Sequence, residues 1–573
     1  MPLFNFADHE ALGSVSSVDT NTVIVEVADI ELLRRLQVNR LAVLQSSKPG
    51  QHLIGLITQV TRKKIPVEST ENDLDPVTEL NLCKIVLIGT MSDRIGAQEN
   101  VFRRTLESVP EIDANCFSLE GDNLTGFMRV ISHAANIENA LIIGKYTLDD
   151  NAIAYLNGNK LFQRHAFVGG STGSGKSWTT ARIIEQVAEL RNANAIIFDI
   201  HGEYAPLISN GISHFKIAGP GDIEAGRGLS DGIVHLPYWL LSYEALVSFF
   251  VDRSDQNAPN QSMIMAREVN NAKQLYLEQR KESELLKNFT IDSPVPFRLE
   301  DILSSLNQIN TETVQGSRGD KQGEFFGKLS RMISRLENKI SDRRLGFLFQ
   351  GGGETLEFSW LHKLSAALFG SSEEKDGGGV KIIDFSEVPS DILPLIVSLV
   401  ARVAFSVQQW TPANLRHPVA LFCDEAHLYL PDKSNASASD EISIQIFERI
   451  AKEGRKYGAS LVVISQRPSE VNKTILSQCS NFIAMRLTNA EDQGVIKKLL
   501  PDSLGGFSDI LPTLDTGEAL VVGDASLIPS RIRVDEPRNK PNSGTVDFWS
   551  VWQLDTAPDR LKVAINNWRM QSS

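Results

Sequence analysis

The chain contains 573 residues, of which 42% are hydrophobic, and its formal net charge is −14. This length predicts roughly three or four domains, and the acidic charge argues against a surface broadly coated with nucleic acid, although a narrow basic channel stays compatible with it. The four cysteines lack paired or metal-like spacing, which favours a reducing compartment and argues against a zinc site. The first residues resemble no signal peptide. The most apolar segment, residues 392–407, is broken by Pro394 and Arg402 and is interpreted as too short to span a bilayer, so we expect no membrane contact and a cytoplasmic location.

Residues 1–145 are rich in short β-branched runs, such as 22–27, 53–58 and 84–89, separated by polar turns. Strands at this spacing predict a small barrel or sandwich. The next region contains apolar runs that are bounded like buried parallel strands, at 195–200, 380–385, 419–423, 460–465, 482–487 and 519–522. Helical patterns lie between several of these runs, so we predict a doubly wound α/β core.

The pattern changes between residues 236 and 350, where the segments 263–286 and 325–340 are long, charged and amphipathic at helical spacing. A helical insertion into the core is the simplest interpretation, with glycine loops at 351–353 and 377–379 marking the return. The predicted divisions are a β-rich domain (1–145), a first core part (146–235), the insertion (236–350), a second core part (351–535) and a tail (536–573). The tail is expected to end in a helix over 559–571.

Residues 170–177 read Gly-Ser-Thr-Gly-Ser-Gly-Lys-Ser, between an apolar run at 166–168 and a helix-like stretch at 178–191. Strand, glycine loop and helix in this order predict a phosphate-binding loop for ATP. The glycines would let backbone N–H groups face the phosphates, Lys176 would reach the β- and γ-phosphates, and Ser177 would ligate Mg²⁺. A Gly/Ser-rich surface turn is the alternative, which the flanking segments disfavour. The expected nucleotide-binding residues are Gly170, Ser171, Thr172, Gly173, Ser174, Gly175, Lys176, Ser177 and Trp178.

An apolar run at 419–423 is followed by two carboxylates, Asp424 and Glu425. Open α/β sheets bind ligands at the carboxyl ends of their strands, so Asp424 is expected to hold Mg²⁺ and Glu425 to polarise the attacking water. Alone, a strand that ends in solvated acids would be the favoured interpretation, but the phosphate loop earlier in the chain favours function. Residues 424–427 also spell the DEAH box of a helicase superfamily, whose other motifs are not evident.

Two further strand ends carry candidate residues. Asp199 lies near the end of the run at 195–200 and Glu203 follows that run, which we expect beside the strand of the phosphate loop. The two acids could complete the metal and water network. The alternative is a plain turn at Gly202. Gln466 ends the run at 460–465 and could sense the γ-phosphate or position water.

A ring ATPase needs an arginine from the neighbouring subunit to neutralise charge in the transition state. A helix-like stretch at 441–457 carries Arg455, our candidate, with Arg449 and Arg486 as alternatives. A solvated basic helix end is about as good an interpretation of any one of them. The row Arg331, Arg335, Lys339, Arg343 and Arg344 lies at near-helical spacing, and a solvated helix face is favoured over DNA contact.

Taken in order, the strings at 169–177, 198–204, 422–431, 453–471 and 516–523 resemble the HerA family of hexameric DNA-translocating ATPases, within the FtsK/HerA group. The resemblance spans about residues 145–535 and implies a RecA-like core, and the β-rich N-terminus resembles the HAS-barrel of that family. It also implies a homo-hexameric ring with ATP between subunits and double-stranded DNA in its pore. By position, Arg164 resembles the cis-acting arginine of the family. The polar stretch at 431–444 departs from the pattern and puts the assignment of Arg455 in doubt.

Family members commonly work with a separate effector, a nuclease or a Sir2-like protein, in DNA end processing or in antiphage defence. Three functions therefore stay open. The first is an ATP-driven duplex DNA translocase or helicase that acts with such an effector, and the second is a regulatory ATPase scaffold that controls the effector without processive translocation. The third, a conjugation-type coupling or secretion ATPase, usually brings membrane segments.

Overall fold

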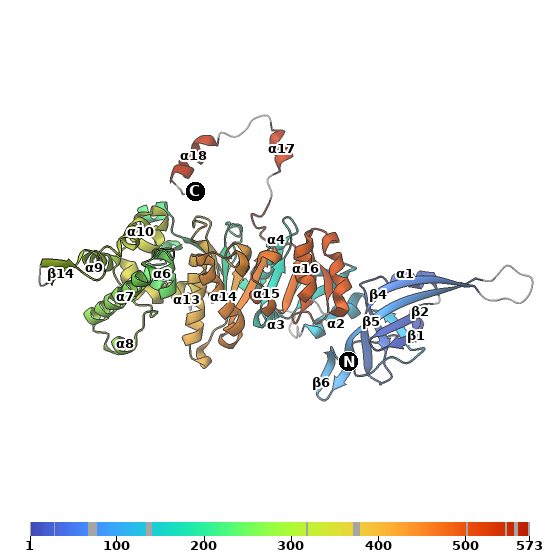
Figure 1. The fold of residues 1–573 in the computed structure, drawn as a ribbon. Helices are drawn as coiled ribbons and strands as arrows, with labels where there is room; N and C mark the ends of the chain where they lie inside the picture. The colour runs from blue at the N-terminus through green and yellow to red at the C-terminus, as the bar shows by residue number, and fades with distance from the viewer. Residues whose placement is uncertain are drawn as a thin grey trace, which may run out of the picture. The chain divides into compact units, whose positions relative to one another are not determined.

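The computed structural model describes residues 2–27, 29–66, 77–132, 140–316, 319–370, 379–499, 502–544, 547–554 and 560–570. The chain forms two compact units (Figure 1). The first comprises Met1–Ile183 with Ser480–Glu536, and the second comprises Ile184–Cys479 with Pro537–Ser573. The boundaries of the five divisions expected from the sequence stay a prediction.

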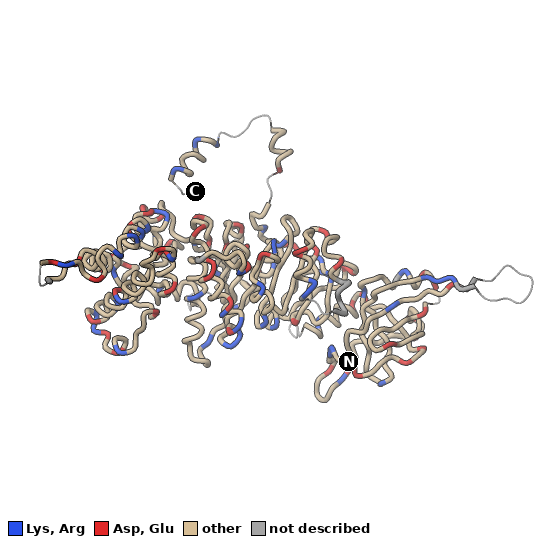
Figure 2. Tube along the Cα trace, in the orientation of Figure 1, with Lys and Arg blue, Asp and Glu red and all other residues tan. Residues whose placement is uncertain are grey.

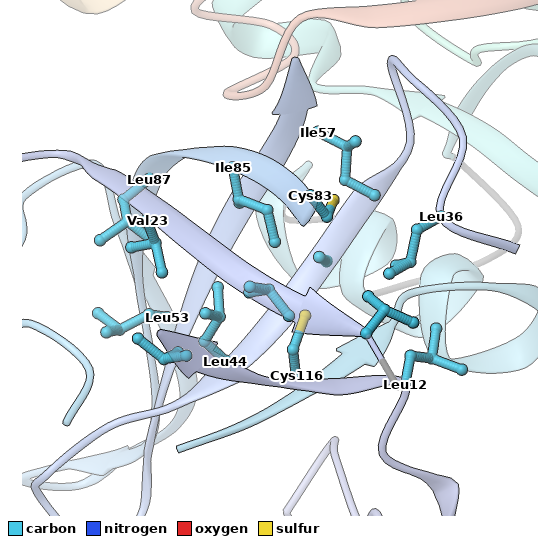
Figure 3. Close-up of a cluster of buried hydrophobic side chains, with 14 of the residues drawn as sticks. Leu12, Val23, Leu36, Leu44, Leu53, Ile57, Cys83, Ile85, Leu87 and Cys116 are labelled. Carbon is cyan, nitrogen blue, oxygen red and sulfur yellow. The ribbon is translucent and has the colours of Figure 1, made fainter. Parts of the chain in front are cut away.

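The N-terminal part of the first unit is a β-barrel. Its strands are β1 (Gly13–Asp19), β2 (Thr22–Val27), β3 (Leu41–Gln45), β4 (Gln51–Pro66), β5 (Val77–Ile95), β6 (Gln98–Arg103) and β7 (Asn115–Ser118). They follow the order β2-β1-β7-β3-β4-β5-β6, and an additional pairing of β2 with β5 closes the barrel. Figure 3 shows its core, where Leu44, Leu53, Ile85 and Cys116 meet, each fully or almost fully buried. Of the two architectures that the sequence left open, the barrel is correct.

The rest of the first unit contains a mixed sheet. Its strands are β8 (Leu141–Tyr146), β9 (Asp149–Leu156), β10 (Ala166–Gly169), β19 (Asn481–Met485), β20 (Glu518–Gly523) and β21 (Ser530–Val534). Strand β10 pairs in parallel with β19, whereas β19–β20, β20–β21, β21–β8 and β8–β9 are antiparallel. The expectation of a parallel strand at 519–522 is therefore wrong. An apolar run buried on both faces has the same pattern in either direction, so its sequence does not indicate strand direction.

The second unit contains a parallel sheet of order β13-β12-β16-β11-β17-β18. Its strands are β11 (Asn194–Asp199), β12 (Ile212–Ile217), β13 (Ile233–Val234), β16 (Gly379–Asp384), β17 (Val419–Cys423) and β18 (Ala459–Ser465). Every pairing among them is parallel, which confirms four of the predicted runs. Strand β11 lies between β16 and β17, so the expectation that it neighbours the strand of the phosphate loop is wrong. Consecutive strands are adjacent only about two-thirds of the time.

Helices fill the region predicted as an insertion: α6 (Tyr243–Phe250), α7 (Ala258–Arg280), α8 (Ser283–Asn288), α9 (Leu299–Thr311), α10 (Ser330–Ser341) and α11 (Gly346–Phe349). A further helix, α12 (Trp360–Phe369), follows beyond the predicted end of the insertion. The predicted helix at 263–286 is two helices, because Lys281 adopts a left-handed φ of 60° and ends α7. A hairpin of β14 (Thr313–Gly316) and β15 (Gly319–Gln322) was not predicted. Of the glycine loop expected at 377–379, only Gly379 lies within the described residues, where it begins β16.

The apolar segment at 392–407 is helix α13 (Leu393–Trp410). Its 18 residues are long and apolar enough to cross a membrane by length and composition, so the expectation that it is too short is wrong. Pro394 does not break the helix, since it lies in the first turn, where no helical N–H is lost. However, 72% of the segment is buried inside the protein, with Arg402 donating to the carbonyl of Leu240. A core helix passes the same test, so α13 is weak evidence for a membrane span.

The C-terminal tail begins as an extended stretch on the second unit. Backbone N–H groups of Arg538 and Asn539 donate to the Glu185 carboxylate at 2.9 and 2.7 Å, and Asn542 N donates to the carbonyl oxygen of Glu203 at 2.7 Å. Two helices follow, α17 (Phe548–Trp552) and α18 (Leu561–Met570), and neither has a buried residue. Helix α18 confirms the described part of the helix expected at 559–571, whose ends lie outside the described residues.

Candidate functional site

The phosphate loop lies between β10, which ends at Gly169, and α4 (Lys176–Ala188). Gly173 and Gly175 adopt φ of 74° and 105°, which L side chains rarely reach. A Cβ on Gly170 would lie 2.4 Å from Ser174 Oγ and 2.8 Å from Met485 Cβ, so only glycine fits at that position without a shift. The side chains at the start of α4 are buried, with exposed fractions of 8% for Lys176 and 7% for Ser177. The loop thus has the strand–loop–helix form expected of it, with Trp178 half-buried in the first turn.

Two segments distant in sequence hold this loop. The carbonyl oxygen of Arg486, just after β19, accepts from Ser171 N at 2.9 Å and from Ser171 Oγ at 2.8 Å. Gly517 N, in the turn before β20, donates to Ser174 O at 2.9 Å. Sequence reasoning missed these supports. Their only signal in the sequence is the string at 516–523, which stands out for its family resemblance alone.

In the second unit, carboxylates line one edge of the parallel sheet. Asp199 is paired with Asp384 in the register of β11 and β16, and Phe198 is paired with Cys423 in that of β11 and β17. Asp384, Asp199 and Asp424 therefore follow one another across three neighbouring strand ends. Cys423 is in turn paired with Val463 of β18, so Gln466 leaves the sheet at the same edge. The structure brings together all the predicted second-unit residues except Arg455, and it adds Asp384, which belongs to no motif.

Asp199 caps the turn that carries Glu203. Its carboxylate accepts from Glu203 N and Tyr204 N, both at 2.9 Å, and Gly202 takes a φ of 71°. The turn at Gly202 is therefore confirmed, whereas the role of Asp199 and Glu203 in a metal and water network stays a prediction. Burial raises the pKa of Asp199 to about 6, with the two backbone hydrogen bonds opposing this and the charges of Asp384 and Glu203 adding to it.

Asp424 and Glu425 are both buried, with exposed fractions of 1% and 6%. Glu425 adopts φ 43° and ψ 44°, a left-handed conformation that costs a residue with a Cβ on the order of 1 kcal/mol. His427 Nδ1 lies 3.2 Å from Glu425 Oε2 and 3.3 Å from Ser465 Oγ. Strained backbone at a row of buried acids is typical of functional sites. In the sequence, the histidine stands out only within the misleading DEAH string.

The candidate arginines lie elsewhere. Arg455 is exposed in the last turn of α14 (Ala438–Tyr457), which leads directly into β18. This turn lies at the amino edge of the strands, because Arg416, three residues before β17, donates to Lys456 O at 3.3 Å. Arg455 is thus remote from Asp424 of its own chain, as an arginine serving a neighbouring subunit would be. Arg449 packs 5.3 Å from the Phe405 ring and pairs with Glu453 at 3.4 Å.

Arg164 lies just before β10, whereas the phosphate loop follows that strand. Its Nε is 3.7 Å from Asp524 Oδ2, and its carbonyl oxygen accepts from Ser480 N at 2.9 Å. A four-residue strand separates its ends by roughly 13 Å. The structure therefore does not bring Arg164 together with the phosphate loop of its own chain.

Comparison with known proteins identifies relatives that match most of the chain. A family model described as "Helicase HerA, central domain" matches residues 141–404. The DNA double-strand break repair helicase HerA of Saccharolobus solfataricus is 23% identical over 87% of this chain and 88% of its own length. The HerA helicase of Pyrococcus furiosus is 26% identical over 72% of this chain and 73% of its own length.

Two solved structures align with parts of this chain. The conjugative coupling protein TrwB matches 75% of this chain and 94% of its own, with 15% identity and a TM-score of 0.44. VirB4 of Thermoanaerobacter pseudethanolicus matches 69% of this chain and 96% of its own, with 16% identity and a TM-score of 0.43. The phosphate loop, the α/β core and the N-terminal barrel agree with the similarity to the HerA helicases, which extends over most of the chain, and the chain is an ATPase.

Proposed function

We propose that this chain is the motor subunit of a homo-hexameric ring in which ATP hydrolysis drives translocation along double-stranded DNA or its unwinding. The observation that carries the proposal is the presence, in one chain similar to the HerA helicases, of a complete phosphate loop and a row of buried strand-end carboxylates at Asp199 and Asp424. The HerA relatives are named DNA repair helicases, which supports DNA as the substrate of the motor.

In this proposal the loop from Gly170 to Ser177 binds the phosphates of ATP through its backbone N–H groups, and Lys176 neutralises the γ-phosphate. Glu425 activates the attacking water, and Gln466 responds to the γ-phosphate. Asp199 and Glu203 hold the polar network at the strand ends. The hydrogen bonds of Ser171 and Ser174 support these roles, because they fasten the loop to the segments that follow β19 and precede β20.

The residues also fit a magnesium ion. Ser177 and Asp424 are buried oxygen donors, and Mg²⁺ is bound by one or two carboxylates together with phosphate oxygens. When bound, the ion would neutralise charge on the phosphates during transfer. Assignment of these two side chains as its protein ligands is part of the proposal.

We further propose that the ring acts with a separate effector, a nuclease or a Sir2-like protein, in DNA end processing or antiphage defence. The exposed aromatic residues of the tail support a protein contact, since Trp549, Trp552 and Trp568 have exposed fractions of 72%, 71% and 76%. The same feature favours the second candidate function, an ATPase scaffold that assembles and controls the effector without processive translocation.

The decisive experiment is steady-state ATP hydrolysis with and without linear duplex DNA at low and moderate salt. Strong stimulation that fades with salt supports the DNA motor, whereas unchanged basal turnover favours the scaffold. Two variants test the site assignment. Lys176→Ala is expected to abolish turnover, and Glu425→Gln is expected to keep ATP binding but stop hydrolysis. Normal turnover in either variant contradicts its assigned role.

A further inference from the structure

We propose that a groove along helix α10 binds the phosphate backbone of duplex nucleic acid. This inference rests on the proposed DNA motor and assigns it a contact surface. Residues 328–344 are strongly basic within a chain whose net charge is −14, and Figure 2 shows basic positions clustered along α10. The cations are Lys328, Arg331, Arg335, Lys339, Arg343 and Arg344, against the acids Glu337 and Asp342.

One face of α10 presents the cations to solvent. Arg331, Arg335 and Lys339 are four residues apart, so they lie along a single face of the helix. The opposite face is packed into the protein through Met332, Ile333 and Leu336, which are at most 5% exposed. The helix is thus held rigidly by its apolar side while its basic side faces outward.

The basic face lines a groove of about 590 Å³. Ser334 and Asn338 lie between the cations, and Asp252 stands in the same groove. Arginine, lysine, serine and asparagine are the side chains that proteins use to contact phosphate and sugar. Among the described residues that line the groove, none is aromatic and could stack on a base, and none is apolar and could anchor a protein partner. This lining favours the backbone of a duplex over a single strand or a protein.

The acids of the groove are already engaged by other residues. Ser254 donates two hydrogen bonds to Asp252 Oδ1, from its Oγ at 2.7 Å and from its backbone N at 3.0 Å. These two bonds are the main reason that the pKa of Asp252 is lowered, and the charges of Arg335 and Arg331 lower it further. Arg344 binds Asp342 at 2.7 Å.

The cations differ in their own partners. Lys339 Nζ lies 4.9 Å from the Phe249 ring. Within the described part of the chain, no ion pair of 4 Å or less involves Arg331 or Arg335. Their charge therefore remains available to an incoming phosphate.

The test uses the full-length protein and a fluorescent linear duplex, with affinity measured by anisotropy over a series of salt concentrations. The double variant Arg331→Gln/Arg335→Gln is expected to weaken binding about tenfold and to reduce the slope of log affinity against log salt by about two, with no dependence on DNA sequence. Basal ATP turnover without DNA should be unchanged. A double variant Lys287→Gln/Lys321→Gln removes the same charge from exposed positions of α8 and β15 and should bind as the wild type does.

Wild-type affinity and slope in the Arg331/Arg335 variant would overturn this inference while leaving the DNA motor intact. Equal losses in both double variants would also overturn it, because only overall charge would matter. A loss confined to single-stranded DNA would refute the duplex as the ligand. Failure of the wild type itself to bind duplex DNA would instead remove the proposed function, so the two failures are distinguishable.

Discussion

Glu425 Oε2 lies 3.2 Å from His427 Nδ1, and the same nitrogen is 3.3 Å from Ser465 Oγ. Because Glu425 follows β17 and Ser465 ends β18, the histidine bridges two neighbouring strand ends. A carboxylate that is to activate water must be held in a fixed direction, and the left-handed backbone at Glu425 alone leaves its side chain torsions open. We infer that His427 orients this carboxylate.

Replacement of His427 by alanine is therefore expected to lower the kcat of ATP hydrolysis about tenfold, the worth of one hydrogen bond to a charged group. The KM for ATP should change little, since His427 is inferred to act on the attacking water through Glu425 and not on the phosphates. His427→Gln, which keeps a donor, should recover part of the rate. His417→Ala, at the other end of β17, is the matched control. Equal kcat in His427→Ala and wild type would refute the orienting role.

Gly170→Ala is expected to lower ATP affinity about tenfold or more and to reduce the temperature of unfolding. The added Cβ meets Met485 Cβ at 2.8 Å, and that atom belongs to a strand that cannot rotate away, so the loop must move. Gly158→Ala, at the start of α3 (Gly158–Gln163), is the control, because a Cβ added there would meet no atom within 4 Å. Titration with a fluorescent ATP analogue measures the affinity. Tight binding by Gly170→Ala would show that the loop adapts.

Asp199 makes stability depend on pH in a defined direction. Its pKa in the folded state is about 6, above the ordinary value of 3.8, so the folded state holds its proton more tightly than the unfolded chain. Its favourable contribution is complete below about pH 4, decreases as the pH rises through the window from 4 to 6, and is lost above it. The stability of Asp199→Asn relative to wild type should thus rise between about pH 4 and 7, by up to about 3 kcal/mol, whatever the constant cost of losing one acceptor oxygen.

Thermal unfolding of both proteins across this range measures the difference. Glu324→Gln, at an exposed position, controls for the loss of one charge. A difference between wild type and Asp199→Asn that is constant with pH would contradict the raised pKa.

Arg455→Ala is expected to retain nucleotide binding and lose hydrolysis, because Arg455 lies at the strand edge opposite to Asp424 and would act on a neighbouring subunit. Mixing this variant with Glu425→Gln subunits tests the sharing of sites, since some interfaces would then contain an intact Arg455 facing an intact Glu425. Partial recovery of turnover on mixing supports a shared site. Inactivity at every ratio argues against it.

Four parallel strands of the second unit were predictable because each is a short apolar run followed by polar residues, as at Asp199 and Asp424, whereas β12 and β13 are too polar or too short to show this pattern. Their order was not, because periodicity contains no information on which strands cross over, and β11 proved to lie beside β16 and β17. Periodicity also contains no information on strand direction, so the antiparallel direction of β20 was not predicted. Asp384 escaped notice because its strand end belongs to no motif.

Contacts between distant segments were also beyond prediction. Ser171 donates to the carbonyl oxygen of Arg486, which is 315 residues away in the sequence. His427 lies within hydrogen-bond distance of Ser465, and the sequence does not show this contact. Arg164 shows the converse error: it is close to the phosphate loop in sequence, yet a strand lies between them, because a strand carries the chain from one edge of the sheet to the other.

The backbone bond from Asn542 to Glu203 gives the end of the chain a mechanical connection to the strand edge, because Glu203 is itself fastened to Asp199. Tension applied to α17 or α18 would therefore reach that turn through residues 537–544. A shortened chain that ends at residue 536 loses α17, α18 and the segment 537–544 that connects them to the turn. A chain that ends at residue 544 loses only the two helices. Comparing the two shortened chains therefore separates the effect of losing the exposed helices from the effect of losing their connection to the turn at Glu203.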